Sequence, residues 1–148
     1  MYSLKSLHSF GFPSSAHAIM PIDAVADLQA KLKKLNNAAF YILGEGSNTV
    51  FLEDFLGTII KPAFMGIDLE HTNTHYLLKV GATENWHQLV LWCMQHKIYG
   101  LENLALIPGT VGAAPIQNIG AYGVEVKQFI HQVDYYDLSE QTHKSLDS

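Results

Sequence analysis

Residues 107–123 read Ile107-Pro108-Gly109-Thr110-Val111-Gly112-Ala113-Ala114-Pro115-Ile116-Gln117-Asn118-Ile119-Gly120-Ala121-Tyr122-Gly123. Glycine and proline punctuate this segment, yet most of its residues are apolar, which is unusual for a surface loop. The small residues from Gly109 to Ala114 leave a surface that a flat ring or a pyrophosphate could approach closely. Gln117 and Asn118 lie inside an apolar run and need hydrogen-bond partners if they are buried. A heteroaromatic ligand or backbone groups could supply them, so a tightly packed structural loop is the alternative interpretation.

A second glycine-rich segment reads Gly44-Glu45-Gly46-Ser47-Asn48 and follows a short apolar strand expected at residues 40–43. Two glycines one residue apart let the backbone turn tightly, with positive φ, and bring several N–H groups to one point. Such a nest binds phosphate oxygens without a cationic side chain. The segment differs from the dinucleotide fingerprint of doubly wound folds, because a strand at residues 49–52 is expected after it and not a helix. An ordinary hairpin-like loop is the alternative.

Hydrophobic periodicity predicts two helices. The first is expected over residues 23–36, with Asp23 as its cap. The second is expected over residues 84–97, with Thr83 as its cap. Its apolar stripe consists of Trp86, Leu89, Val90, Cys93 and Met94.

Apolar and β-branched runs predict the strands. After residue 52 they are expected at residues 57–60, 66–70, 75–80 and 129–138, followed by a turn at 139–140 and a final short strand. The order up to Pro62 is then strand, helix and three strands. A shift in composition at Pro62 indicates two lobes, at residues 1–62 and 63–148.

Composition excludes several classes of function. The chain has 148 residues, a net charge of −5 and no arginine, and it lacks the basic face that nucleic-acid binding requires. A single cysteine, Cys93, rules out an internal disulfide and fits a reducing compartment. No signal-peptide pattern or membrane-length apolar run is present, so a cytoplasmic protein without membrane association is expected. The eight histidines are scattered, and no metal site is expected.

The two glycine-rich segments belong to a wider pattern. Together with Ser9-Phe10-Gly11, Gly81-Ala82-x-Glu84-Asn85-Trp86-His87 and Gly100-Leu101-Glu102-Asn103-Leu104-Ala105-Leu106, they resemble the UDP-N-acetylenolpyruvoylglucosamine reductase family, also called UDP-N-acetylmuramate dehydrogenases. The resemblance extends from about Leu4 to about Asp137. Residues 117–123 resemble the enterobacterial-like branch of the family. Ala113-Ala114 differ from the Gly-Ser-Ser form of some members, which puts one hydroxyl contact in doubt.

The resemblance implies an α+β fold: the FAD-binding fold of the vanillyl-alcohol-oxidase or PCMH type, with two small α+β lobes, truncated at its C-terminus and lacking the substrate-binding domain. It implies that FAD is the cofactor. The residues that it implies for FAD binding are Gly44, Glu45, Gly46, Ser47, Asn48, Pro108, Gly109, Thr110, Gly112, Ala113, Gln117, Asn118, Gly120, Ala121, Tyr122 and Gly123.

The resemblance also implies an activity for the full-length parent. NADPH supplies a hydride, and FAD passes it to the enolpyruvyl ether of a UDP-sugar to give UDP-N-acetylmuramate for peptidoglycan, the cell wall, cell shape and cell division. The family's catalytic serine, arginine and glutamate lie beyond Ser148, so the fragment alone is expected to be inactive and to need the missing part for its UDP-sugar. Two alternatives stay open: a non-catalytic lobe that binds a nucleotide or a partner, and a flavin oxidoreductase of the same fold with another substrate.

Overall fold

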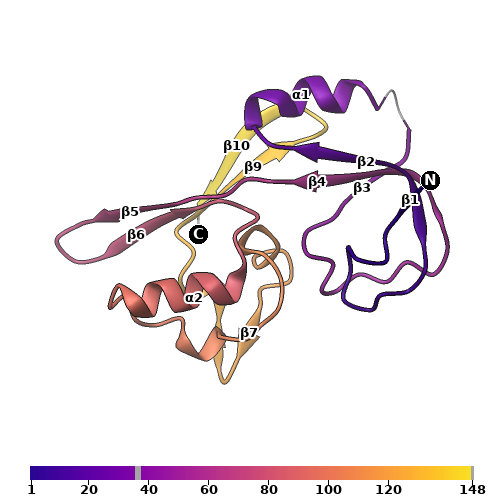
Figure 1. Ribbon diagram of the computed structural model, residues 1–148. Helices are drawn as coiled ribbons and strands as arrows, with labels where there is room; N and C mark the ends of the chain where they lie inside the picture. Colours follow the sequence, from indigo (N-terminus) through magenta and orange to yellow (C-terminus); the bar gives the residue numbers. More distant parts are fainter. Residues whose placement is uncertain (36–37, 148) are drawn as a thin grey trace.

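The structure is a computed structural model that describes residues 1–35 and 38–147. The chain forms two parts with separate hydrophobic cores. Figure 1 shows them one above the other, with the indigo and magenta N-terminal sheet above and the orange segment below. A yellow hairpin near the C-terminus returns to the upper part.

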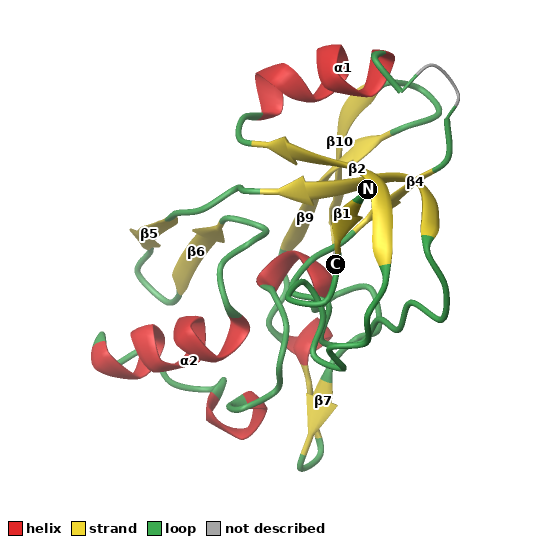
Figure 2. Ribbon diagram, turned by 45° about the vertical axis from the view of Figure 1, so that its right-hand side comes forward, coloured by secondary structure: helices red, strands yellow, loops and turns green. Residues whose placement is uncertain are grey.

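The upper part is built on a four-stranded sheet. Its strands lie in the order β1 (Tyr2–Ser3), β2 (Ser15–Ile22), β4 (Phe55–Pro62) and β3 (Phe40–Ile42). Both β2 and β3 run parallel to β4, whereas β1 is antiparallel to β2. Helix α1 (Val25–Lys33) lies along β2, as Figures 1 and 2 show.

Strand β4 has apolar side chains packed on both of its faces. Consecutive side chains of a strand point to opposite faces. Ile59 therefore packs with Leu4 and Leu43 on one face, and Ile60 packs with Leu35 and side chains of α1 on the other. Full burial of one such side chain stabilises the fold by about 1.5–3 kcal/mol. The end of β4, at Lys61 and Pro62, is therefore held firmly by the packing on both faces of the strand.

The lower part packs around α2 (Trp86–Gln95). The antiparallel hairpin of β5 (Ile67–His71) and β6 (Tyr76–Val80) lies against this helix. After α2 come the 3₁₀ helices η1 (Glu102–Leu104), η2 (Val111–Ala113) and η3 (Val126–Gln128), and the short hairpin of β7 (Gly120–Ala121) and β8 (Val124–Glu125). The indole N–H of Trp86 donates to the carbonyl of Leu104 at 2.8 Å, which satisfies the indole in the core.

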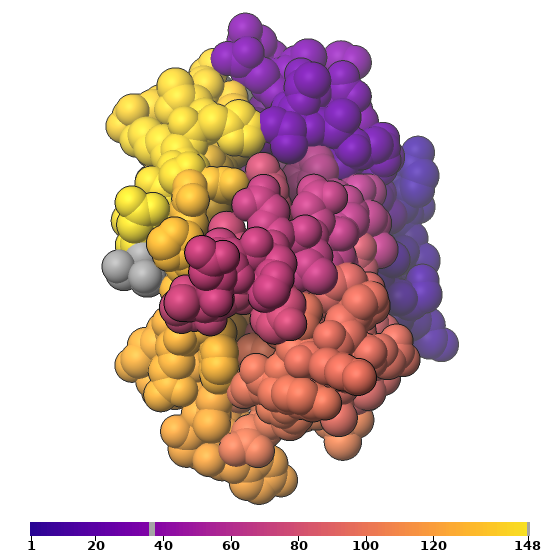
Figure 3. Space-filling model, turned by 90° about the vertical axis from the view of Figure 1, so that its left-hand side faces the viewer, coloured from indigo at the N-terminus to yellow at the C-terminus, as the bar shows by residue number. Residues whose placement is uncertain are grey.

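The last hairpin consists of β9 (Gln132–Asp137) and β10 (Thr142–Asp147), paired antiparallel. It lies beside α1, as Figures 1 and 3 show, and so brings the end of the described chain back to the upper part. The division into lobes at Pro62, the last residue of β4, stays a prediction.

Both predicted helices are confirmed with shorter bounds than expected, and residue 36 lies outside the described residues. Their predicted caps are wrong. No side chain caps α1, and Asp23 instead pairs with Lys31 at 3.3 Å. The hydroxyl of Thr83 donates to the carbonyl of Phe64 at 2.7 Å, which leaves Asn85 as the cap of α2. The predicted stripe of α2 is buried except for Met94, which is exposed.

The predicted strands near β3, β4, β5, β6, β9 and β10 are confirmed with small shifts at their ends. Residues 49–52 form a loop instead of the expected strand. The physical reason is that Phe51 packs its ring on the cluster of Leu43 and Ile59, so its apolar character serves packing and not strand pairing. The order before Pro62 is also different, because two strands, β1 and β2, precede α1.

Candidate functional site

One cavity of about 340 Å³ opens between the two parts of the chain. Its walls come from the end of β3 and the loop after it, from the start of α2 and from the loop that contains η2. The lining residues are Tyr41, Ile42, Gly44, Glu45, Gly46, Ser47, Asn48, Thr49, Pro62, Ala82, Thr83, Trp86, Pro108, Gly109, Thr110, Gly112, Ala113, Ala114, Ile116, Gln117 and Ile119. The two glycine-rich segments singled out in the sequence therefore meet at one place.

The loop at residues 44–48, called the nest loop below, is fixed by hydrogen bonds from the N-terminal segment and from β4. The N–H of Ser9 donates to the carbonyl of Gly46 at 3.1 Å, and the ammonium of Lys61 donates to the carbonyl of Gly44. Gly46 has a φ of +69°, and a Cβ atom there would lie 2.7 Å from the Cα of His8. Only glycine fits this position, because both the backbone angle and the N-terminal segment exclude a side chain.

The N–H groups of the nest loop are available for a ligand. Within residues 1–35 and 38–147, no hydrogen bond joins the backbone N–H of any residue from Gly44 to Asn48 to a protein acceptor. Gly44, Gly46 and Ser47 are buried or half-buried, and N–H groups in such places normally have a partner. Several unpaired N–H groups on one turn of backbone form an anion-binding concavity.

The second loop packs directly on the first. A Cβ atom on Gly109 would lie 3.2 Å from the Oγ of Ser47, and one on Gly44 would lie 3.3 Å from the Oγ1 of Thr110. The contact therefore requires glycine, or a small shift, on each side. Because the two loops touch at these points, their relative position in the lining of the cavity is fixed.

Backbone hydrogen bonds tie the second loop to the start of α2. The N–H of Gly112 donates to the carbonyl of Ala82 at 2.8 Å, and the N–H of Val111 donates to the carbonyl of Glu84 at 2.9 Å. In return, the N–H of Trp86 donates to the carbonyl of Gly109 at 2.9 Å. These bonds use groups that a helix start and a loop would otherwise leave unpaired.

Two side-chain hydrogen bonds join the nest loop to the second loop and to the start of α2. The amide of Asn48 donates to the side-chain oxygen of Gln117 at 3.0 Å, and the amide of Asn85 donates to the carboxylate of Glu45 at 2.8 Å. Gln117 is exposed and Asn118 half-buried, so the need for a hydrogen-bond partner that burial would impose does not apply to Gln117. The amide NH₂ of Gln117 donates in no hydrogen bond found among the described residues and is free for a polar ligand.

Lys61 and Glu45 are the charged residues at the nest loop. Partial burial lowers the pKa of Lys61, and the carboxylate of Glu45 opposes this shift in part. In the neighbouring core, burial and then the charge of Glu102 raise the pKa of the Cys93 thiol, which fits its predicted place on the apolar stripe of α2 and disfavours the reactive thiolate. His87 accepts a hydrogen bond from the N–H of Leu106 at 3.2 Å and so supports the loop before the cavity.

Eleven of the predicted cofactor-binding residues line the cavity: Gly44, Glu45, Gly46, Ser47, Asn48, Pro108, Gly109, Thr110, Gly112, Ala113 and Gln117. The other five lie outside its lining. Asn118 accepts a hydrogen bond from the N–H of Lys127 at 3.1 Å. Residues 120–123 are strand β7 and the turn of the β7–β8 hairpin, which projects from the lower part in Figures 1 and 2, and Tyr122 in this turn is 88% exposed. Their contact with a cofactor stays a prediction.

Sequence reasoning did not place several lining residues at the site. Tyr41 and Ile42 end β3 just before the nest loop, and an apolar strand end next to a glycine-rich loop is the signal that points to them. Ala82 and Thr83 lie within the quoted motif at residues 81–87. The sequence predicted Thr83 as a helix cap and gave Ala82 no role at the site, whereas both residues line the cavity. Trp86 is both core and wall, since its ring is buried while it also borders the cavity.

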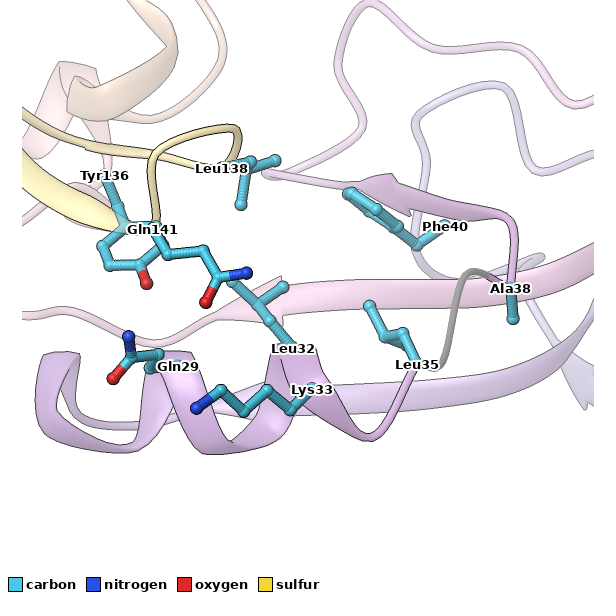
Figure 4. A pocket seen from close by; sticks show the side chains of 9 residues that line it. All are labelled: Gln29, Leu32, Lys33, Leu35, Ala38, Phe40, Tyr136, Leu138 and Gln141. Carbon is cyan, nitrogen blue, oxygen red and sulfur yellow. The ribbon is translucent and has the colours of Figure 1, made fainter.

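A second cavity, of about 320 Å³, lies between α1 and the β9–β10 hairpin (Figure 4). Leu32, Leu35 and Phe40 point into it, and Gln29, Lys33 and Gln141 stand at its border. The two glycine-rich loops do not contribute to its lining, which comes from α1, the start of β3 and the β9–β10 hairpin. We therefore regard it as a packing seam and the first cavity as the candidate site.

Membrane-spanning helices and metal clusters are both absent from the described part of the chain. None of the helices within residues 1–35 and 38–147 is long and apolar enough to cross a membrane. Among the same residues, no group of three or more His, Cys, Asp or Glu side chains is arranged to hold a metal ion.

Comparison with known proteins identifies similar chains. The model of a family described as FAD binding domain matches residues 17–144. UDP-N-acetylenolpyruvoylglucosamine reductase from Pseudoalteromonas atlantica is 49% identical over 142 residues, which cover 95% of this chain and 41% of that protein. The protein of the same name from Idiomarina loihiensis is 43% identical, with 99% of this chain and 43% of that protein covered. The chain spans about two fifths of the length of these curated relatives.

A solved structure is also similar. The crystal structure of UDP-N-acetylenolpyruvylglucosamine reductase from Thermus caldophilus aligns with a TM-score of 0.72 at 24% identity, covering 98% of this chain and 50% of that chain. At this identity the likeness shows the fold alone. Together with the family match, it confirms the α+β FAD-binding fold expected from the sequence, and the curated relatives confirm the resemblance.

Proposed function

Because the chain belongs to the FAD binding domain family, we propose that its cavity binds FAD and that the chain is the FAD-binding portion of a UDP-N-acetylenolpyruvoylglucosamine reductase. The observation that carries the site is the nest loop, whose consecutive N–H groups have no protein acceptor among the described residues and which lines the cavity. In a chain without arginine, such a loop is a direct way to bind a diphosphate.

The rest of the cavity suits the other parts of the cofactor. Gly109, Gly112 and Ala113 offer a wall without bulky side chains, along which a flat ring can lie. Gln117 and Asn48 supply polar groups on the same side. We assign the nest loop to the diphosphate and the second loop to the flavin. We propose Asn118 and residues 120–123 as further contacts of the cofactor.

We assign the reduction to the whole protein, not to this chain alone. When bound, FAD supplies hydride transfer, while the protein supplies binding and orientation. We propose NADPH as the hydride donor, the UDP-N-acetylglucosamine enolpyruvyl ether as the acceptor, and peptidoglycan synthesis in the cytoplasm, with its consequences for cell wall, shape and division, as the setting. The lone cysteine fits that compartment.

A titration with FAD tests the site. Trp86 borders the cavity, whereas Trp92 stacks on His96 with ring centroids 3.8 Å apart, so a Trp92→Phe background makes fluorescence report on the cavity. We expect saturable quenching, a bound-flavin visible spectrum, weaker binding of riboflavin, and competition by ADP. Riboflavin lacks the diphosphate, so equal affinities for riboflavin and FAD, or no saturable binding of FAD, would contradict the proposal.

An activity assay tests whether the reduction needs the whole protein or only this chain. We expect no oxidation of NADPH that depends on the UDP-enolpyruvyl sugar when the 148-residue chain is supplied with FAD. Substrate-dependent turnover by this chain would show that residues assigned to cofactor binding also carry the chemistry. A full-length protein that binds FAD but reduces only another substrate would favour a different flavin oxidoreductase of the same fold. One that binds FAD without any reductase activity would favour a non-catalytic lobe.

A further inference from the structure

Lys61 occupies a distinctive position behind the nest loop. It lies on β4 next to Pro62, which lines the cavity, and its ammonium donates to the carbonyl of Gly44, which lines it too. The strand that carries Lys61 is buried on both faces by Ile59 and Ile60. The base of this side chain is therefore held on a rigid support.

The hydrogen bond from Lys61 orients a peptide of the nest loop. A trans peptide unit is planar, and its C=O and N–H point in opposite directions. Holding the carbonyl of Gly44 toward Lys61 therefore turns the N–H of Glu45 away from Lys61. That N–H is one of the donors without a protein acceptor among the described residues. A single contact thus sets the direction of a ligand-binding group that lies one residue away.

The charge of Lys61 is also unmatched within the described chain. The lysines found in ion pairs there are Lys31, Lys127 and Lys144. Glu45 is the acid that acts on Lys61, but its carboxylate already accepts from the amide of Asn85 at 2.8 Å. The partly buried ammonium therefore lies behind the nest loop with no carboxylate bound to it among the described residues.

From this arrangement we propose that Lys61 is a positioning residue for the diphosphate of the bound dinucleotide: it fixes the Gly44–Glu45 peptide and supplies the positive charge behind the nest loop. The inference rests on the proposed FAD site and deepens it. Backbone N–H groups give the phosphate oxygens their hydrogen bonds, and the lysine supplies the full charge that a neutral nest lacks. In a chain without arginine, that charge falls to a lysine.

Three substitutions separate the two roles. Lys61→Met removes both the donor and the charge, Lys61→Gln keeps a donor without the charge, and Lys61→Arg keeps both. Lys79→Met is the matched control, because Lys79 is an exposed lysine on another strand, β6, and does not line the cavity. Affinities for FAD and riboflavin are measured on the 148-residue chain at several salt concentrations, with the thermal midpoint of each variant.

We expect Lys61→Met to weaken FAD binding about tenfold to hundredfold, the size of a lost charge-assisted hydrogen bond, while riboflavin affinity stays unchanged. The FAD affinity of Lys61→Met also depends less on salt concentration than that of the unsubstituted chain. Lys61→Arg restores binding, and Lys61→Gln restores only part. An equal loss for both ligands, an effect of Lys79→Met as large as that of Lys61→Met, or unchanged FAD affinity in Lys61→Met would overturn the inference. If the unsubstituted chain fails to bind FAD, the proposed function itself has failed, which is a different result.

Discussion

Asn85 donates a hydrogen bond to Glu45 at 2.8 Å across 40 residues of sequence, and so joins the start of α2 to the nest loop. The oxygen of the same amide accepts from the N–H of Gln88 at 3.0 Å and caps the helix. Both ends of one side chain are used, one for stability and one for the site. The start of the helix and the geometry of the loop are therefore coupled.

Substitution of Asn85 separates these two roles. Asn85→Ala loses the cap, which costs about 1 kcal/mol of stability, and also releases Glu45. Asn85→Asp keeps an acceptor at the cap but loses the donor, and it places a second carboxylate beside Glu45. We expect urea denaturation to show the larger loss of stability for Asn85→Ala, which also loses the cap, and FAD titration to show weaker binding for both. FAD affinity unchanged in Asn85→Asp would show that the contact with Glu45 does not matter for the site.

Gly46 and Gly123 provide a matched pair, since their φ angles are +69° and +79°. Alanine at either position incurs the strain of the left-handed conformation, about 1–2 kcal/mol. Only at Gly46 would the new Cβ also meet backbone atoms, those of Leu7 and His8, whereas nothing lies within 4 Å at Gly123. We expect Gly46→Ala to be the more destabilising and to lose FAD, and Gly123→Ala to keep FAD.

The same pair tests the limits of the site. Gly123 is a cofactor-binding residue according to the family resemblance, yet it lies on the β7–β8 hairpin outside the cavity lining. Equal losses of FAD affinity in Gly123→Ala and Gly46→Ala would mean that the cofactor reaches the hairpin. Denaturation midpoints of both variants show how much of each loss comes from folding.

Local signals in the sequence were enough for the helices and for the two loops. The stripe of Trp86, Leu89, Val90 and Cys93 has helical spacing, and all four residues are buried on α2. The two glycines of the nest loop indicated a tight turn of the backbone, and Gly46 does have a positive φ, whereas Gly44 does not. These features depend on residues that are neighbours in sequence.

Features that depend on distant residues were not predictable. The parallel pairing of β2 with β4 joins Ala18 to Thr58, and nothing in either segment names its partner. Thr83 and Asn85 are both good caps, and the choice between them depends on the carbonyl of Phe64, which takes the threonine hydroxyl. Lys61 looks like a solvent-facing lysine in the sequence, and only the fold brings it to Gly44.

Cys93 gives a prediction about reactivity. The thiol is 1% exposed, and burial, followed by the charge of Glu102, raises its pKa. The thiolate is the reactive form, so we expect a water-soluble aromatic disulfide reagent to react very slowly with the folded chain at neutral pH and rapidly in urea. Fast stoichiometric reaction without denaturant would mean that α2 opens readily from its core. The rate constant, compared with that of a free thiol, gives the free energy of that opening.

Asp137 gives a prediction about acid stability. Its carboxylate accepts from the ammonium of Lys144 at 2.8 Å, from the hydroxyl of Ser139 at 2.6 Å and from the N–H of Glu140 at 3.1 Å. These bonds, that of Lys144 first, hold the pKa of Asp137 well below its ordinary value of 3.8. Because the folded pKa is lower than the unfolded one, this contribution to stability is present above pH 3.8 and is lost as the pH falls further.

Asp137→Asn tests this contribution at the turn between β9 and β10. We expect the variant to be less stable than the unsubstituted chain at neutral pH and to lose less stability on acidification below pH 3.8, so that the two curves converge in acid. Asp147→Asn, at the far end of the hairpin, is the control, since Asp147 accepts no side-chain hydrogen bond found among the described residues. Thermal midpoints at low salt measure the effect, because the ion pair is partly exposed and salt screens it. Parallel curves for Asp137→Asn and the unsubstituted chain would show that this carboxylate does not stabilise the hairpin through its charge.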